Sequence, residues 1–161
     1  MKTRNLLFKA FLITTLFFAS LVNDSKAQSN WEVGIRFGDE FAIDATIPLS
    51  AKPRLHAAAY FGGHGSDFGL AGYFDWMFSL EGGPTGLKLY PGVGPEFYFG
   101  DNFNVGVAGD FGAEYSFDFP LTIGLDWRPG IMFTNDIGFH SSNWGIIARF
   151  RFGEGVKFNA E

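Results

Sequence analysis

Large apolar residues and polar residues alternate along most of the chain after residue 30. The stretch 110–128 shows the pattern most clearly, with Phe111 and Tyr115 on one parity and Asp110 and Glu114 on the other. A period of two places alternate side chains on opposite faces of a β-strand. A second alternating run follows the tight sequence Asp118-Phe119-Pro120, so the stretch predicts a two-faced antiparallel hairpin.

Eight segments in all carry this alternation, and they predict an all-β fold. The predicted strands are Trp31–Phe37, Phe41–Pro48, Arg54–Phe61, Phe68–Ser79, Leu87–Phe99, Phe103–Phe117, Leu121–Thr134 and Trp144–Phe152. The connections between them are rich in Gly, Pro, Asn, Asp and Ser, which favour turns. The first two segments share one parity and could form a single strand, but we predict a turn at Gly38–Glu40. This turn keeps Asp39 off the apolar face and gives the even strand number usual in bacterial barrels.

The two faces of the predicted strands differ sharply in chemistry. The Phe residues within the strands and all four Trp residues lie on one parity, whereas the charged residues lie on the other. The charged positions are Glu32, Arg36, Asp44, Arg54, Asp75, Lys88, Glu96, Asp110, Glu114, Asp126, Arg128, Arg149 and Arg151. This separation predicts a single closed antiparallel eight-stranded up-and-down β-barrel. Alternation alone does not decide which face is inside: a soluble lipocalin-like barrel has its apolar face inside, and a membrane barrel has it outside.

Three observations favour the arrangement with the apolar face outside. The interior of an eight-stranded barrel is only just wide enough to be filled by side chains, and the aromatic face is too bulky for it. The polar face is rich in glycine, which makes room inside a crowded barrel but weakens an exposed sheet surface. The glycines of this face are Gly34, Gly69, Gly92, Gly94, Gly106, Gly112, Gly124, Gly130 and Gly145. The acidic and basic residues also nearly balance, as charges in an interior must pair. We therefore predict a transmembrane barrel.

The N-terminal residues predict export. Lys2 and Arg4 precede the apolar run Phe11–Val22, and Ser25-Lys26-Ala27 is a small-x-small cleavage site, so residues 1–27 are predicted to be a signal peptide. The apolar run is shorter than the roughly 20 residues of a spanning helix. The remaining chain divides into a barrel at 28–152 and a flexible tail at 153–161. The predicted location is the cell outer membrane, with the turns 49–53, 80–86 and 118–120 in the periplasm and the connections 38–40, 62–67, 100–102 and 135–143 outside.

The composition excludes several classes of fold, chemistry and partner. The 161 residues include 22 Gly, which a helical protein would not tolerate, and no Cys, which excludes disulfides and thiolate chemistry. The net charge of −5, without a basic stripe, argues against a nucleic-acid partner.

Several short motifs resemble a known family. They are Val33-Gly34-Ile35-Arg36, the run Gly86–Gly94, Gly112-Ala113-Glu114-Tyr115, and Phe119-Pro120-Leu121 leading into Leu125-Asp126-Trp127-Arg128-Pro129. The chain is similar to the small eight-stranded outer-membrane β-barrel proteins of Bacteroidota, related to OmpA-like and OmpW-like porin-type barrels. The resemblance implies a monomer whose partners are outer-membrane lipids and lipopolysaccharide. The aromatic-ended strand Ile147–Phe152 resembles the signal read by the barrel-assembly machinery, although nine residues follow it.

The polar face of the last three strands carries the main candidate chemistry. Its charged residues are Asp110, Glu114, Asp126, Arg128, Arg149 and Arg151. They could line a pathway for a solute, or they could form a packed salt-bridge network to which Tyr73, Tyr90 and Tyr98 add hydroxyl groups. The narrow interior of eight strands favours the network. Pro129 within a central strand predicts a bulge near this site.

The string His140-Ser141-Ser142-Asn143 resembles the His-x-Ser-Asn motif of the outer-membrane lipid A deacylases, which are also eight-stranded barrels. A serine hydrolase needs a histidine base and an acid that orients it, and Glu154 is the nearby downstream carboxylate. Because the string falls in a predicted external loop and Glu154 lies beyond the last strand, an ordinary polar turn is the favoured interpretation.

No cofactor or metal site is predicted. His56, His64 and His140 are scattered without the spacing of ligand pairs, and the glycine-rich stretches at 62–65 and 81–84 are followed by no helix that could bind phosphate. The sequence thus predicts a non-enzymatic outer-membrane barrel with a role in structure or in the passage or binding of a small solute. Two alternatives stay open: a lipid A-modifying hydrolase, and a soluble exported barrel that binds a hydrophobic ligand.

Overall fold

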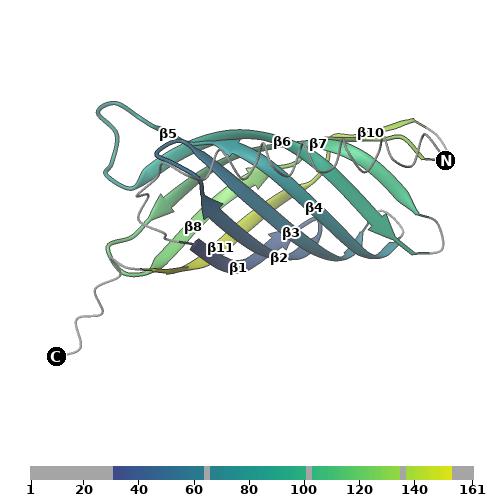
Figure 1. Cartoon of the computed structure of the whole chain (residues 1–161), viewed down its shortest axis with the longest axis horizontal. Helices are drawn as coiled ribbons and strands as arrows, with labels where there is room; N and C mark the ends of the chain where they lie inside the picture. The colour runs from purple at the N-terminus through teal and green to yellow at the C-terminus, as the bar shows by residue number, and fades with distance from the viewer. Residues whose placement is uncertain (1–30, 64–65, 101–102, 135–136, 154–161) are drawn as a thin grey trace, which may run out of the picture.

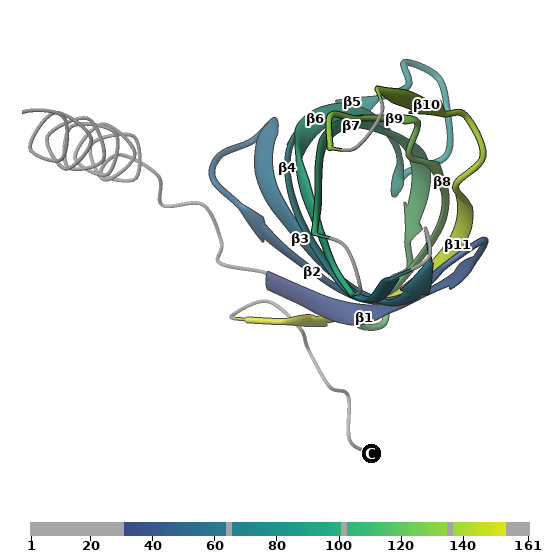
Figure 2. The same cartoon turned by 90° about the vertical axis from the view of Figure 1, so that its right-hand side faces the viewer.

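The computed structural model describes residues 31–63, 66–100, 103–134 and 137–153. Over these ranges the chain is all-β, and its long strands close into a single antiparallel barrel of eight strands, as predicted (Figures 1 and 2). The predicted signal peptide at 1–27 and nearly all of the predicted tail at 153–161 lie outside the described residues.

The strands follow the predicted segments closely. They are β1 (Trp31–Gly38), β2 (Phe41–Pro48), β3 (Pro53–Gly63), β4 (Ser66–Trp76), β5 (Phe78–Ser79), β6 (Leu87–Phe99), β7 (Asn104–Ser116), β8 (Leu121–Trp127), β9 (Gly130–Met132), β10 (Gly138–His140) and β11 (Trp144–Phe152). The long strands pair in chain order, β4 with β6 and β8 with β11 among them, and β11 closes the barrel on β1, with Trp31 opposite Phe152. The predicted turn at Gly38–Glu40 is present, since Arg36 in β1 lies opposite Ala42 in β2.

The fourth predicted strand is interrupted without a change of register. Asp75 in β4 lies opposite Gly92, and Phe78 in β5 lies opposite Leu89, so both strands advance by three residues. The interruption lies beside Pro91, which has no backbone N–H to donate to the ladder. We therefore treat β4 and β5 as two segments of one barrel strand.

The bulge predicted at Pro129 is absent on the β7 side. Phe111 lies opposite Trp127 and Ala108 lies opposite Gly130, so β8 and β9 continue past Pro129 in one register on β7. The carbonyl of Pro129 accepts a hydrogen bond from the Gly109 N–H at 2.9 Å. The ladder on β7 thus loses the proline donor but needs no extra residue. On the other side, residues 128–129 lie opposite the three residues 141–143, so the irregularity predicted near Pro129 is on that side.

A short hairpin of β9 and β10 was not predicted. Beyond the start of β11, β9 pairs with β10, with Phe139 opposite Ile131. Strand β10 has only three residues, which is too short for alternation to identify it in a predicted loop. The hairpin extends the barrel wall at the end away from Trp31 and Phe152 (Figure 1).

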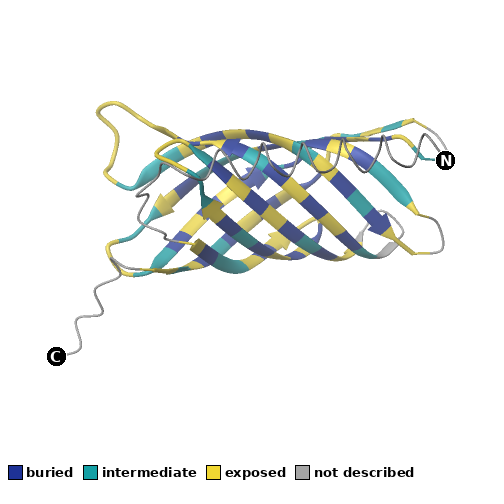
Figure 3. Ribbon diagram, viewed as in Figure 1, coloured by how far each residue is buried: buried dark blue, intermediate teal, exposed yellow. Residues whose placement is uncertain are grey.

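Burial alternates residue by residue around the barrel (Figure 3). In β2, for example, Ile43 is 45% exposed whereas Asp44 is fully buried. The large apolar residues face outward and the charged residues face inward, as the limited width of the interior predicted.

Glycines on the inner face make room for large side chains, as predicted. A Cβ atom added at Gly112 would overlap the ring of Tyr90, and one added at Gly145 would overlap the guanidinium of Arg36. Gly69 is similar, because its Cβ would lie 2.7 Å from Cδ1 of Tyr98. Interior side chains therefore occupy the volume that these glycines leave empty.

Candidate functional site

Arg128 is the centre of a network of charges that fills the barrel. Its side chain is 1% exposed. Its guanidinium lies 2.7 Å from Asp126 Oδ2, 3.1 Å from Asp44 Oδ2 and 3.2 Å from Asp110 Oδ1, and it donates a hydrogen bond of 2.8 Å to the Tyr60 hydroxyl. Arg128 follows directly after β8, whereas Asp44 lies in β2 and Tyr60 in β3. This arginine therefore links late and early strands of the chain across the barrel interior.

Three further arginines extend the network. Arg54 lies between Asp75, at 2.9 Å, and Glu114, at 2.8 Å. Arg149 binds the same Glu114 and donates to Glu32 at 3.0 Å. Arg36 donates to Asp126 at 2.8 Å. Buried guanidiniums are costly unless they are paired and hydrogen-bonded, and each of these four has carboxylate partners.

Tyrosines continue the polar interior toward the end of the barrel that carries β10. The hydroxyls of Tyr60 and Tyr73 are 2.8 Å apart, and Tyr73 donates in turn to Glu96. Nearer the end, Tyr98 donates to Glu40 Oε2 at 3.2 Å and Asn143 Nδ2 donates to the same oxygen at 3.1 Å. Burial is the main cause that raises the pKa of Glu40, which lies in the turn between β1 and β2, above its usual value.

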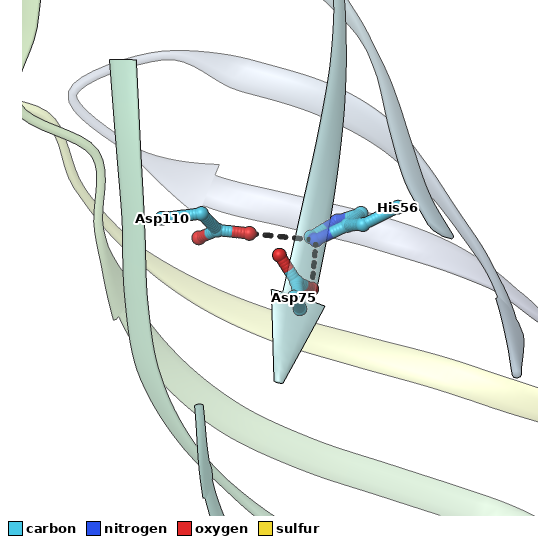
Figure 4. Close-up of side chains that lie close together, drawn as sticks. All are labelled: His56, Asp75 and Asp110. Atoms are coloured by element: carbon cyan, nitrogen blue, oxygen red, sulfur yellow. Dashed lines mark ion pairs between the residues drawn. The ribbon is translucent and has the colours of Figure 1, made fainter. Parts of the chain in front are cut away.

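His56 lies among carboxylates in the middle of the barrel (Figure 4). Its Nδ1 atom is 2.7 Å from Asp110 Oδ2 and 3.3 Å from Asp75 Oδ2, and its Nε2 atom is 3.1 Å from Asp44 Oδ2. The histidine comes from β3, Asp75 from β4 and Asp110 from β7. All three side chains are buried, so this cluster is screened from solvent.

Among the described residues, buried acidic groups outnumber buried basic groups. The buried carboxyl residues are Glu32, Glu40, Asp44, Asp75, Glu96, Asp110, Glu114 and Asp126, and the buried basic residues are Arg36, Arg54, His56, Arg128 and Arg149. The near balance expected from the sequence is therefore wrong for the interior proper. The difference arises because Lys88 and Arg151, counted on the polar face, are only half-buried near the strand ends, whereas Glu40, predicted in a turn, is buried; His56 adds one basic group.

Five of the six charged residues predicted to line the last three strands join the network: Asp110, Glu114, Asp126, Arg128 and Arg149. Arg151 does not. It lies next to the end of β11 and donates to the backbone carbonyls of Phe117 and, at 2.6 Å, Phe119. It holds the turn between β7 and β8 rather than a buried carboxylate, because the strand leaves the interior at this point.

The three predicted tyrosines act in different ways. Tyr73 and Tyr98 donate to carboxylates as described above, whereas the ring of Tyr90 lies under the Arg54 guanidinium, 4.4 Å from its centre. The packed network predicted from the polar face is thus present. Its large side chains, among them Arg36, Arg128 and Arg149, are fully buried in the interior.

Sequence reasoning missed the contribution of the first strands. Parity placed Arg36, Asp44 and His56 on the polar face, but it did not show that they meet Arg128 and Asp126. Closure of the predicted barrel could have revealed these contacts. In a closed barrel β1 must pair with the last strand, and this pairing places side chains from both ends of the sequence in one interior.

The string His140-Ser141-Ser142-Asn143, for which an ordinary polar turn is the favoured interpretation, begins at the last residue of β10 and continues through the connection to β11. Ser141 and Ser142 are exposed, and His140 ends β10. Asn143 is buried and used structurally, since its side chain donates to Glu40 and its carbonyl accepts from Arg36 at 2.9 Å. Glu154, the nearby downstream carboxylate, lies outside the described residues, as does His64.

The outer surface carries a ring of aromatic residues at the end where β1 and β2 meet. Successive ring contacts, with centroids 5.1 to 6.2 Å apart, run around this end from β1 to the start of β7. The residues are Phe37, Phe41, Phe61, Phe68, Phe99 and Phe103.

The opposite end has its own aromatic contacts. Trp31 stacks on Phe152 with centroids 4.4 Å apart, Phe74 packs on Trp76, and Phe117 stacks on Phe119. Between the two ends many exposed positions are aliphatic, among them Ile35, Ile43, Leu70, Leu125 and Ile146, although Phe111 in the middle of β7 is also exposed. The outer surface is therefore an aliphatic band with aromatic residues on both sides.

Comparison with known proteins adds no relative: no family model, no curated protein and no solved structure matches this chain. In the part of the chain that the structure describes, no helix is long and apolar enough to cross a membrane. The resemblance to the Bacteroidota barrels thus stays an expectation from sequence motifs.

Proposed function

We propose that this protein is an integral β-barrel of a bacterial outer membrane, without enzymatic activity, in contact with lipid and lipopolysaccharide as a monomer. The observation that carries the proposal is the outward-facing aliphatic band bordered by aromatic residues at both ends. Membrane barrels have an apolar band of about this kind between two aromatic girdles. Soluble monomers rarely expose an apolar patch beyond about 300–600 Å².

The interior favours this proposal over a soluble barrel that binds a hydrophobic ligand. A ligand site for an apolar molecule is lined mainly by hydrophobic and aromatic side chains. The centre of this barrel instead holds Arg128, His56 and their carboxylate partners. An apolar guest there would strip buried charges of partners, at several kcal/mol for each.

The packing of the interior favours a structural or small-solute-binding role over free passage. Arg36, Arg128 and Arg149 are all below 2% exposed and are fixed by ion pairs. A solute larger than water would have to separate these pairs. We expect the purified barrel to show at most a small conductance in planar bilayers.

Fractionation of cells that express the full chain tests the location. We expect the protein in the outer-membrane fraction after a urea wash, and a shift of electrophoretic mobility when the sample is boiled, because a closed barrel resists detergent until heated. Recovery in the periplasmic fraction without detergent, with no shift, would contradict the proposal and favour the soluble barrel.

A lipid analysis tests the absence of catalysis. Lipid A from cells that express the protein should have the same acyl chains as lipid A from cells that express Ser142→Ala. A change of acylation that depends on Ser142 would replace the proposal with the hydrolase.

A further inference from the structure

We propose that His56, Asp75 and Asp110 form a binding site for one divalent transition-metal ion inside the barrel. The site is a feature of the folded interior, so the inference holds whether the barrel lies in a membrane or in water. It concerns a histidine that its spacing in the sequence left unassigned.

The geometry brings the three ligand groups together from three strands. Nδ1 of His56 faces Asp110 Oδ2 at 2.7 Å and Asp75 Oδ2 at 3.3 Å (Figure 4), and one candidate ligand atom from each residue lies within 4.8 Å of the others. Two ligands of one zinc ion, each about 2.1 Å away, lie roughly 3 Å apart. A shift of a few tenths of an ångström in the Asp110 side chain would admit an ion.

One unsatisfied atom in the cluster points to a missing ligand. His56 Nδ1 contacts Asp110 Oδ2 and Asp75 Oδ2 as ion pairs of 2.7 Å and 3.3 Å, whereas Asp75 Oδ1 has no hydrogen-bond partner among the described residues. The three side chains are at most 1% exposed. Buried polar atoms are nearly always paired, so the unpaired Asp75 oxygen needs an explanation. A cation that accepts electron pairs from the imidazole nitrogen and both carboxylates would supply a partner for it.

Metal binding at Nδ1 requires the His56 tautomer with its proton at Nε2. Asp44 Oδ2 lies 3.1 Å from Nε2, where it can accept that N–H, and Arg128 Nη2, 3.2 Å from the same nitrogen, must then donate to carboxylates and not to the ring. Proton placement at Nε2 leaves the lone pair of Nδ1 directed at Asp75 and Asp110. A histidine that ligates a metal commonly donates its other N–H to a carboxylate in this way, which fixes the ring and raises its basicity.

Two arginines hold the carboxylates in place without blocking the ring nitrogen. Arg54 donates to Asp75 Oδ2 at 2.9 Å, and Arg128 donates to Asp110 Oδ1 at 3.2 Å, which leaves Asp110 Oδ2 for the ion. One nitrogen and two oxygen ligands suit Zn²⁺, Mn²⁺ or Fe²⁺. The excess of buried carboxylates over buried basic groups also favours a bound cation, because it offsets negative charge in the interior.

Metal retention by the refolded barrel tests the proposal. Because the site is buried, Zn²⁺ is supplied during refolding of chelator-treated protein in detergent, and excess ion is then removed by dialysis. We expect about one Zn²⁺ per chain by elemental analysis, and we expect Co²⁺ in its place to give the visible absorption of a low-coordinate nitrogen–oxygen site. A wild-type barrel that folds but retains no stoichiometric metal overturns the proposal and leaves His56 as an ion-pair partner alone.

Variants separate this site from adventitious binding. Asp110→Asn and His56→Gln should lose the retained metal and the Co²⁺ absorption, and Asp44→Asn should weaken binding by about 10–100-fold. His140→Ala is the matched control, since this histidine lies on β10 and outside the cluster, and it should retain the ion. Loss of metal in His140→Ala, or unchanged binding in both ligand variants, would overturn the assignment. The mobility shift on boiling reports whether each variant folds, and should a ligand variant fail to fold, the wild-type stoichiometry and the Asp44→Asn titration decide.

Discussion

The inner and outer faces of the barrel are built from the same strands, yet they tolerate change very differently. On β8, Leu125 is 59% exposed, whereas its neighbour Asp126 is 1% exposed and binds two arginines. On the outer face, a residue needs only to be apolar. Inside, each residue must match particular partners in charge, length and direction, since an unpaired buried charge costs several kcal/mol.

The largest expected effect comes from removal of the central arginine. Arg128→Met leaves Asp44, Asp110 and Asp126 without a shared partner, and breaking a buried pair in this way costs about 3–5 kcal/mol. We expect the variant to unfold at much lower urea concentration or to fail to fold, as measured by tryptophan fluorescence and by the mobility shift. The control is Leu125→Val on the same strand, which should behave like the wild type. Equal stability of the two variants would mean that the inner face is as tolerant as the outer face.

The next effect tests what the outer face contacts. Leu125→Arg places a charge in the aliphatic band, where a membrane barrel loses about 2–4 kcal/mol near the bilayer midplane. The same change at Phe119, next to one end of the barrel, should cost only about 0–1 kcal/mol. Folding titrations into lipid vesicles measure both. Little cost at either position would show that the band does not face hydrocarbon.

A smaller effect tests the packing of the inner face. Gly145→Ala places a methyl group against the Arg36 guanidinium, and overpacking of this kind costs about 1–3 kcal/mol. Gly72→Ala is the matched control, because no atom lies within 4 Å of a Cβ at that position. Urea midpoints of the two variants check the difference. Similar midpoints would indicate that the interior has room to adjust.

The smallest expected effect is the dependence on pH at the turn between β1 and β2. Burial raises the pKa of Glu40, so its charged form opposes folding. This cost is absent below the ordinary pKa of a glutamate, grows as pH rises through the pKa of the folded state, and is then constant. Glu40→Gln keeps an oxygen that can accept from Tyr98 and Asn143, and it should therefore be slightly more stable than the wild type at pH 7 but not at pH 4. Urea midpoints at both values measure this, and a larger gain at pH 4 would reverse the sign.

Most of the fold could be predicted because alternation is a local property. The bounds of Phe41–Pro48, Leu87–Phe99 and Trp144–Phe152 agree with β2, β6 and β11. The differences from prediction lie where the local sequence pattern does not determine how the strands pair. Pro129 leaves the register on β7 unchanged, and the irregularity predicted near it lies on the other side, where residues 128–129 face residues 141–143; β10 is too short to show a period.

The site was predicted less completely because its contacts join residues distant in sequence. Asp110, Glu114, Asp126, Arg128 and Arg149 were expected together because they share a face of three consecutive strands. His56 was set aside for its isolation in the sequence, although it meets Asp110 at 2.7 Å in the interior. Spacing along the chain identifies ligand pairs only when they share a strand or a loop, and here three strands each supply one group.

By itself, the sequence determined the strands, the two faces of each strand and, through the volume of the aromatic residues, which face lies outside. These features follow from a period of two and from the sizes of the side chains, which are local properties that can be read from the sequence. Only the tertiary structure decided which charge meets which, and that Arg151 holds a turn while His56 lies among three carboxylates. Such pairings depend on the closure of β1 on β11 and on the register of every strand between them, and no single segment contains that information.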